Sequence, residues 1–461
     1  MGDWKHTYES LNEGDLVQLD LLGFKIVVIN SARVAKDLLD RRSASYSDRP
    51  HTTFVIELAE FGKSTALLKY AEPWKQQRKI IAHEFSNSST ISRYWSLQEH
   101  QARLLVNSLL KNPGQMRREV SMRLMLAVQL IAYGYPVTSP DDECLQLVTE
   151  SLRDFTSAGK LGAYLVDFFP ILKYVPEWMP GAGFQREARR MKETVNKACH
   201  MPFEWTKRHL PTGEAQMPNL CGTILSEAQG PLSREEEETI KWAAISAVGA
   251  GLDTTVATTL GFFLAMMVNP EAQKKAQAEV DSVVGSERLP SITDRSSMPY
   301  VRSVFTEVLR WNPPVPLCLP HSSGKDDFYN GYHIPKDSII LPNIWFMTHD
   351  PEIYEEPSKF MPERFNNSDA EMKKVNELVF GFGRRTCPGM QFAEGAVFAI
   401  IATTLATCDI LPELDDSGKP ILPELNWSDG VISLPPDFKC KLQPRSPKAL
   451  SLLVDANLSL E

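Results

Sequence analysis

The chain has few cysteines, and they do not form a pattern that suggests a shared structural site. Seven are scattered over 461 residues, their number is odd, and no two have the C-x-x-C spacing. A disulfide framework or a structural zinc site is therefore not expected, and a reducing compartment is favoured.

Basic charge is also in short supply. Lysine and arginine number 49 against 58 acidic residues, so the formal net charge is -9, and the charges are interspersed. A nucleic-acid-binding surface needs a basic stripe, which this distribution does not provide. We therefore expect no nucleic-acid partner.

The chain opens without a long apolar run. The segment Met1–His6 reads M-G-D-W-K-H, far from the ~20 apolar residues that a membrane span needs. Repeats, low-complexity stretches and Ser/Gly-rich linkers are absent from the sequence as well. We expect residues 1–461 to form a single domain, with no membrane anchor and no Pro-rich hinge.

The dominant pattern in the sequence is helical periodicity. The range 72–284 is predominantly helical, and a long apolar helix is expected over 388–406. Strands are expected in a hairpin over 16–30 and in short pieces over 313–342. Ser31 should cap a helix over 31–39, and short strand and turn segments should end the chain. The fold class is mainly α with a small β part.

The loop from Phe380 to Gly389 reads F-G-F-G-R-R-T-C-P-G and is the most informative segment. Its glycines permit tight turns and a close approach to a flat ligand. Pro388 suits the first position of a helix, so Cys387 should lie at a helix N-terminus, where a thiolate that binds metal is stabilised. Arg385 adds a positive charge. A buried structural cysteine is the alternative interpretation.

A second motif, A-G-L-D-T-T, begins at Ala250 in an otherwise apolar helix. The hydroxyl of Thr254 is expected to bond the carbonyl of Ala250, four residues back. Asp253 and Thr254 together can relay protons, which makes them candidate catalytic residues. A plain polar spot on a helix is the alternative.

These motifs resemble the cytochrome P-450 family. The pattern F-x-x-G-x-R-x-C-x-G is met at every fixed position, and the other family motifs occur in the expected order. The resemblance implies a triangular helical prism around a buried heme b, whose iron is bound by the thiolate of Cys387. It implies oxygen activation for Asp253 and Thr254. The chain looks closest to the fungal microsomal branch.

The resemblance assigns roles to residues whose own patterns are weak. Glu307-Val308-Leu309-Arg310 and the P-E-R-F segment containing Arg364 resemble a structural ion network of Glu307, Arg310 and Arg364. Heme propionates are expected to contact Trp74, Arg78, His321 and Arg385. Solvated surface pairs, and a structural role for His321, are the alternatives.

Segments that resemble the family's substrate-contact regions are apolar here, which implies a largely apolar small molecule. A secondary metabolite such as a terpenoid or polyketide fits, although any protein core is lined by similar residues. The expected pocket residues are Leu67, Leu68, Val248, Ala250, Leu317, Leu319, Val431 and Ile432.

The implied activity is that of a heme-thiolate monooxygenase, which hydroxylates or otherwise oxidises its substrate with O2 and two electrons from an NADPH-dependent reductase. Cytochrome b5 is a second candidate electron donor. Lys75, Lys79 and Arg384 are candidate docking residues, with plain solvated side chains as the alternative. A heme-thiolate isomerase or dehydratase that needs no reductase, and a non-enzymatic heme gas sensor, are the competing functions.

The apolar, aromatic segment 168–184 predicts either contact with a membrane surface or a buried connector. We expect a cytosol-facing protein, at the endoplasmic reticulum membrane if an anchor has been removed and otherwise cytoplasmic or peripheral.

Overall fold

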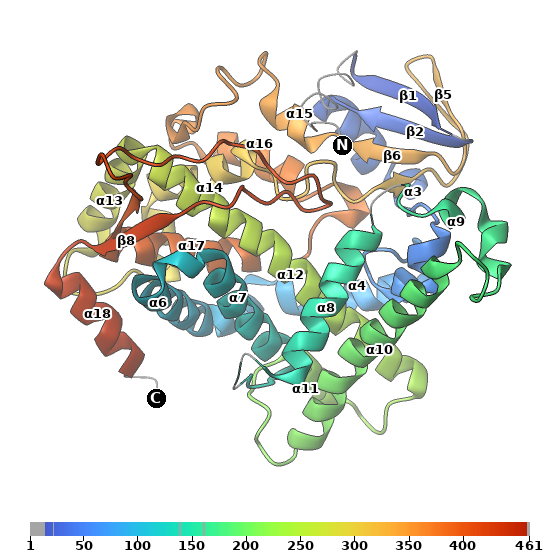
Figure 1. The fold of residues 1–461 in the computed structure, drawn as a ribbon, viewed down its shortest axis with the longest axis horizontal. Helices are drawn as coiled ribbons and strands as arrows, with labels where there is room; N and C mark the ends of the chain where they lie inside the picture. The colour runs from blue at the N-terminus through green and yellow to red at the C-terminus, as the bar shows by residue number, and fades with distance from the viewer. Residues whose placement is uncertain (1–13, 22, 138, 140, 160–161, 459–461) are drawn as a thin grey trace.

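The computed structural model describes residues 14–21, 23–137, 139, 141–159 and 162–458, and Figure 1 shows their path. The expectation about Met1–His6 lies outside the described residues. The α-helices are α2 (Ala32–Ala35), α3 (Ser43–Tyr46), α4 (Glu72–Phe85), α5 (Ser88–Ile91), α6 (Trp95–Lys111), α7 (Met116–Tyr133), α8 (Glu143–Ala158), α9 (Leu165–Phe168), α10 (Gly183–His209), α11 (Leu220–Glu227), α12 (Arg234–Val268), α13 (Pro270–Val284), α14 (Pro299–Trp311), α15 (Ile344–His349), α16 (Asp369–Val379), α17 (Met390–Thr407) and α18 (Pro447–Leu458). The strands are β1 (Leu16–Leu21), β2 (Phe24–Ile29), β3 (His321–Ser322), β4 (Asp327–Tyr329), β5 (Tyr332–Ile334), β6 (Ile339–Pro342), β7 (Cys408–Pro412) and β8 (Cys440–Pro444).

A small sheet at one corner joins the N-terminal hairpin to a distant part of the chain (Figure 1). Its strand order is β1-β2-β6-β3, and β1 pairs antiparallel with β2, as the alternating pattern predicts. β2 then pairs parallel with β6, with Ile26 opposite Ile339. The expected hairpin and the β-rich stretch over 313–342 are therefore confirmed, and the mainly α fold class is confirmed with them.

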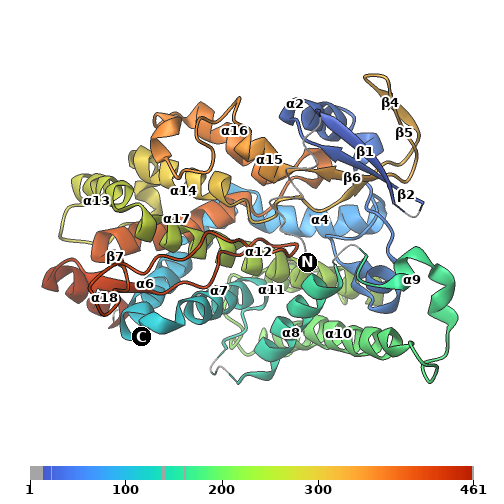
Figure 2. The ribbon, with the colours of Figure 1, turned by 45° about the horizontal axis from the view of Figure 1, so that its top comes forward.

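α12 is the central helix, and the other long helices surround it (Figures 1 and 2). Ser233 and Glu236 form a capping box at its N-terminus, which satisfies backbone amides of the first turn. α12 and α17 are both long and apolar enough to cross a membrane, but 78% and 72% of their apolar windows are buried. Burial against neighbouring helices accounts for this apolar character, as in the core of a large protein.

Three sequence expectations need correction. Ser31 occupies the N-cap position of α2, but its side chain makes no capping hydrogen bond, and the helix continues as a π-helical turn over Lys36–Arg41. α17 begins at Met390, because its first backbone bond runs from Ala393 to Gly389, so Pro388 precedes the helix instead of opening it. The chain does not end in strands and turns, since α18 follows β8.

Candidate active site

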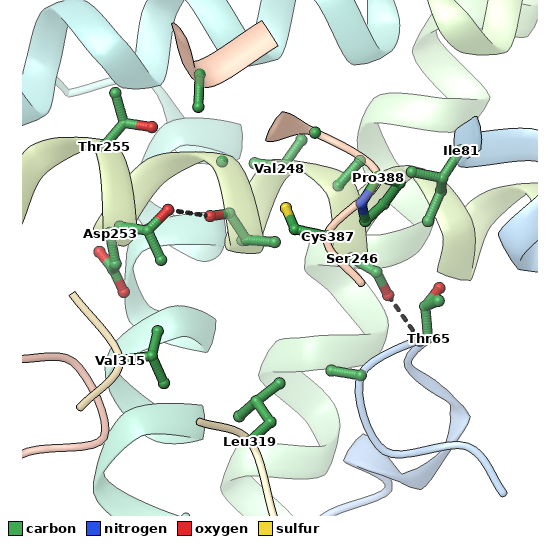
Figure 3. A pocket seen from close by; sticks show the side chains of 18 of the residues that line it. Thr65, Ile81, Ser246, Val248, Asp253, Thr255, Val315, Leu319, Cys387 and Pro388 are labelled. Carbon is green, nitrogen blue, oxygen red and sulfur yellow. Dashed lines mark hydrogen bonds between the residues drawn. The ribbon is translucent and has the colours of Figure 1, made fainter. Parts of the chain in front are cut away.

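One cavity of about 370 Å³ lies under α12 and brings the two main sequence motifs together. Cys387 lines it from the loop before α17, and Val248, Ala250, Asp253 and Thr254 line it from α12. Figure 3 shows the Cys387 sulfur among the lining side chains, in front of the α12 ribbon. The cavity therefore presents a candidate metal-binding thiol and a candidate proton relay to the same enclosed space.

Backbone contacts fix the loop that carries Cys387. The Cys387 amide donates to the carbonyl of Phe380 at 2.7 Å, which closes the turn. Gly383 has a φ of +53°, and a Cβ there would lie 2.1 Å from the carbonyl oxygen of Leu39. Only glycine tolerates both the conformation and this contact. At Gly383 the requirement comes from packing against the chain near Leu39, and not from a flat ligand.

The environment of the Cys387 thiol does not ionise it unaided. Burial raises the pKa of this thiol, whereas the backbone amide of Gly389 and the charge of Arg78 act to lower it. A bound metal cation removes a proton from a coordinating thiol. The site therefore suits a sulfur ligand that becomes a thiolate when the metal binds.

Three arginines line the cavity without an acidic partner. Arg49, Arg78 and Arg385 all contribute to its wall. Within the described residues none of the three forms an ion pair with a carboxylate. They donate to the backbone carbonyls of Ser47, Thr65, Ala66, Leu68, Leu319, Pro320 and Thr386. Buried charges are normally paired, so this cluster is incomplete without an anion.

The pKa values of two of these arginines are also lowered, as expected for buried cations without an acidic partner. Burial, and then the charge of Arg49, lowers the pKa of Arg385 to about 9. Burial likewise lowers the pKa of Arg49 to about 10. The indole ring of Trp74 packs 4.5 Å from the Arg385 guanidinium and also lines the cavity. A ligand with two carboxylates, such as heme, would neutralise these cations through charge-assisted hydrogen bonds.

His321 lies just outside this wall. Its Nδ1 bonds the carbonyl of Tyr46 at 2.7 Å, and its buried Nε2 has no hydrogen-bond partner among the described residues. Burial, then the charge of Arg49, lowers the pKa of His321 to about 3, so the ring is neutral and Nε2 is an acceptor. A carboxylate placed beside it would raise this pKa and turn Nε2 into a donor.

The A-G-L-D-T-T motif that begins at Ala250 contains the hydrogen bond that its sequence predicts. The Thr254 hydroxyl donates to the carbonyl of Ala250 at 2.7 Å. Burial raises the pKa of Asp253, whose carboxyl has no hydrogen-bond partner among the residues that the structure describes. Packing requires a glycine at Gly249, since a Cβ there would lie 2.7 Å from the side chain of Leu152 in α8.

The three members of the expected ion network lie together and are buried. Glu307 accepts two bonds of 2.8 Å from Arg310, one of 3.0 Å from Arg364 and one of 2.8 Å from the amide of Met361. The side chains of Glu307 and Arg310 are fully buried, and that of Arg364 is 8% exposed. The group lies behind the cavity and does not line it.

Five of the expected pocket residues line the cavity, and three do not. Val248, Ala250, Leu319, Val431 and Ile432 are part of the wall, whereas Leu67, Leu68 and Leu317 are not. The carbonyl of Leu68 accepts from Arg385, and Leu67 packs into the core. Ala66 takes their place.

The sequence reasoning missed several lining residues. Phe61 and Phe155 carried no recognisable signal, and Arg49 lies in a loop without a motif. Trp242 and Ile245 could have been found, because they lie at helical spacing before Val248 on the same side of α12.

The segment 168–184 is exposed, so the buried-connector alternative is wrong. Phe169, Ile171, Tyr174 and Trp178 are 53%, 71%, 72% and 80% exposed. Large apolar side chains grouped in this way are typical of an interaction surface.

The candidate docking residues are exposed as well. Lys75 lies 3.6 Å from Glu72, and the guanidinium of Arg384 stacks 4.7 Å from the ring centre of Tyr70. Arg384 belongs to the Cys387 loop, and Lys75 and Lys79 belong to α4.

Comparisons with known proteins agree on one protein family. A family model described as cytochrome P-450 matches residues 5–442. Cytochrome P-450 monooxygenase 226 of the fungus Postia placenta is 45% identical over 453 residues, which cover 98% of this chain and 85% of that protein. Monooxygenase 105 of the same fungus is 44% identical, with 99% and 86% covered. A zebra fish cytochrome P-450 solved with progesterone has a TM-score of 0.79 at 22% identity, covering 96% and 100%, a likeness in fold.

Proposed function

The chain belongs to the cytochrome P-450 family, and we propose that Cys387 binds its heme iron while the α12 motif serves the insertion of one oxygen atom of O2 into a largely apolar small molecule. Monooxygenase relatives that align with 98% and 99% of this chain identify it as a heme-thiolate monooxygenase with heme b as its cofactor. The single observation that supports these residue roles is that the Cys387 thiol and the Asp253–Thr254 pair line one apolar cavity. We further propose that residues 1–461 act as one domain.

The cavity wall has side chains that suit both the iron and the propionates of heme b. Cys387 would supply the sulfur ligand of the iron, and Trp74, Arg78, Arg385 and Arg49 would supply donors and charge for the propionates. His321 would join them after taking up a proton. A heme held by these residues would supply the chemistry that activates dioxygen, and a thiolate ligand would favour cleavage of the O–O bond.

Asp253 and Thr254 hold and move protons on the α12 side. Because the Thr254 hydroxyl donates to Ala250, its lone pairs remain available to accept from water or a ligand in the cavity. The raised pKa of Asp253 brings its proton affinity closer to neutral pH, as a proton carrier requires. These residues suit a relay from solvent to the cofactor side of α12.

Oxygen incorporation separates this activity from the isomerase alternative. With NADPH, a reductase and isotopically labelled O2, we expect one labelled oxygen atom in the product. Turnover without reductant, yielding a rearranged product, would contradict the proposal. Reversible gas binding without NADPH consumption in the presence of any substrate would favour the sensor instead.

We propose a hydrophobic secondary metabolite, such as a terpenoid or polyketide, as the substrate. Phe61, Phe155, Trp242 and Val431 contribute an aromatic and aliphatic wall that would position such a molecule by shape. Spectral titration should show tight binding of terpenoid or polyketide ligands. Equally tight binding of a small charged acid would contradict this substrate class.

We propose that an NADPH–cytochrome reductase, with cytochrome b5 as a second donor, docks near Lys75, Lys79 and Arg384. Lys75→Glu combined with Lys79→Glu should raise the Michaelis constant for reductase. Lys274→Glu is the matched control, because Lys274 is also an exposed helical lysine paired to an acid three residues earlier. Equal constants for both variants would contradict docking at this face.

We propose that the exposed segment 168–184 contacts the endoplasmic reticulum membrane from the cytosolic side. Trp178→Asp should reduce flotation with liposomes, because it places a charge where an apolar ring would enter the interface. Ile353→Asp is the control, since Ile353 is 60% exposed outside this segment. Equal flotation of the parent and Trp178→Asp would contradict membrane contact.

A further inference from the structure

A second, smaller cavity lies behind α12, between α6, α7 and α17. Figure 2 shows these four helices side by side, and they pack against one another. The cavity measures about 20 Å³. A buried water needs a space of roughly 10–15 Å³ and at least two polar partners. The cavity is therefore large enough for at least one water.

Three residues that line this cavity each carry a buried polar atom without a partner. Gln98 Oε1, Gln101 Oε1 and Arg123 Nε are buried and have no hydrogen-bond partner among the described residues. Gln98 is only 3% exposed, and its amide nitrogen is held by the carbonyl of Phe392 at 3.1 Å. Leaving such groups unsatisfied is costly, and ordered water is the usual remedy. A purely apolar void would stay dry, but Gln98, Gln101 and Arg123 bring polar side chains to the otherwise apolar wall of this one.

The inner end of the small cavity meets the cofactor cavity. Val128, Gly251, Thr255 and Phe392 line both spaces, so a single layer of residues separates them. Gly251 contributes no side chain to this layer. Thr255 is 3% exposed, and its hydroxyl makes no hydrogen bond with the described residues. A hydroxyl in this position can exchange a proton with water on either side.

The outer end approaches the protein surface. Gln101 and Arg123 are half-buried, so each has part of its side chain in contact with solvent. The Arg123 guanidinium bonds the Ser108 hydroxyl at 3.2 Å, and burial lowers the pKa of this arginine. The half-buried side chains of Gln101 and Arg123 and the buried side chain of Thr255 therefore line the same small cavity.

We propose that this cavity binds ordered water through Gln98, Gln101 and Arg123, and that Thr255 connects this water to the cofactor cavity as a second proton path beside Asp253–Thr254. The proton-path part rests on the proposed monooxygenase function. That reaction uses two electrons from the reductase and two protons from solvent for each O2, with one oxygen entering the product and the other leaving as water. The path supplies protons only. Each proton that the ordered water passes toward the cofactor cavity is replaced by a proton from solvent.

The water site is tested without turnover. A crystal structure of the holoenzyme at a resolution that shows ordered water should place a water within hydrogen-bonding distance of Gln98 Oε1. In Gln101→Met this water should be lost or displaced, because one acceptor is gone while the side-chain volume is kept. A dry cavity in the parent protein would overturn the site.

The proton path is tested by coupling. Gln101→Met and Thr255→Val should each raise the hydrogen peroxide released per product by about fivefold, the factor that one net hydrogen bond is worth. Their solvent deuterium isotope effect on product formation should differ from that of the parent.

Gln129→Met is the matched control for Gln101→Met. Gln129 lies on α7 and, like Gln101, has a buried Oε1 without a partner, but it lines neither cavity. It should match the parent in peroxide yield and isotope effect. Parent-like coupling in both test variants would overturn the path. A parent protein with the ordered water but without oxygenation would instead contradict the monooxygenase function and leave the water site in place.

Discussion

The buried ion network offers the sharpest energetic test. Glu307→Gln keeps the size of the side chain but removes the one negative charge that Arg310 and Arg364 share. Four hydrogen bonds converge on this carboxylate, and the amide would also point an N–H at guanidinium donors. Breaking a buried pair in this way costs about 3–5 kcal/mol. Against a total stability of roughly 5–15 kcal/mol, such a loss is severe.

Glu363→Gln is the matched control for this test. Glu363 lies one residue from Arg364 and pairs with Lys275 at 2.6 Å, but the side chains of Glu363 and Lys275 are 42% and 58% exposed. An exposed pair contributes about 0–1 kcal/mol. Denaturant unfolding of both variants should therefore show a large loss for Glu307→Gln and a small one for Glu363→Gln. Equal losses would refute the claim that burial makes this network decisive.

Three other predictions address single features. Cys318 has a φ of +54°, so Cys318→Gly should raise the free energy of unfolding by about 1 kcal/mol in urea titrations, and a fall would show that side-chain packing outweighs backbone strain. Arg49→Met should weaken heme binding in hemin titrations, because it removes one unpaired cation from the wall, whereas parent-like affinity would remove Arg49 from the propionate site. For Glu60, burial acts to raise the pKa, but hydrogen bonds from Lys192, Asn196 and Lys63 outweigh it and lower the pKa from 4.5 to about 2. Its ion pairs therefore stabilise the fold above pH 4.5 and lose this effect as the pH falls toward 2. Glu60→Gln should lower the free energy of unfolding at neutral pH, and the two proteins should become equally stable in acid. A difference in stability that stays constant with pH would contradict the lowered pKa.

Most features that were predicted correctly depend on residues that lie close together in the sequence. The Cys387–Phe380 and Thr254–Ala250 hydrogen bonds each join residues that lie within a few positions of each other, so their patterns are visible in the chain itself. The mainly α fold followed from helical periodicity in the same way.

Other features depend on packing between distant segments and left no local signal. Arg49 reaches the cavity only because the chain before α4 folds against the loop at Leu319. The cavity behind α12 exists only where four helices meet, and Arg385 bonds the carbonyl of Leu68 from a distant part of the chain. α18 was missed because its short amphipathic pattern follows a Pro- and Lys-rich tail that reads as turn.

The central claim is the bond between the Cys387 sulfur and heme iron, and the reduced carbon monoxide spectrum of the reconstituted protein tests it directly. Cys318→Ala is the control, because Cys318 lines the same cavity. The parent and Cys318→Ala should show the spectrum of a thiolate ligand, and Cys387→Ala should lose it. A thiolate spectrum that survives in Cys387→Ala, or an imidazole-type spectrum in the parent, would contradict the account.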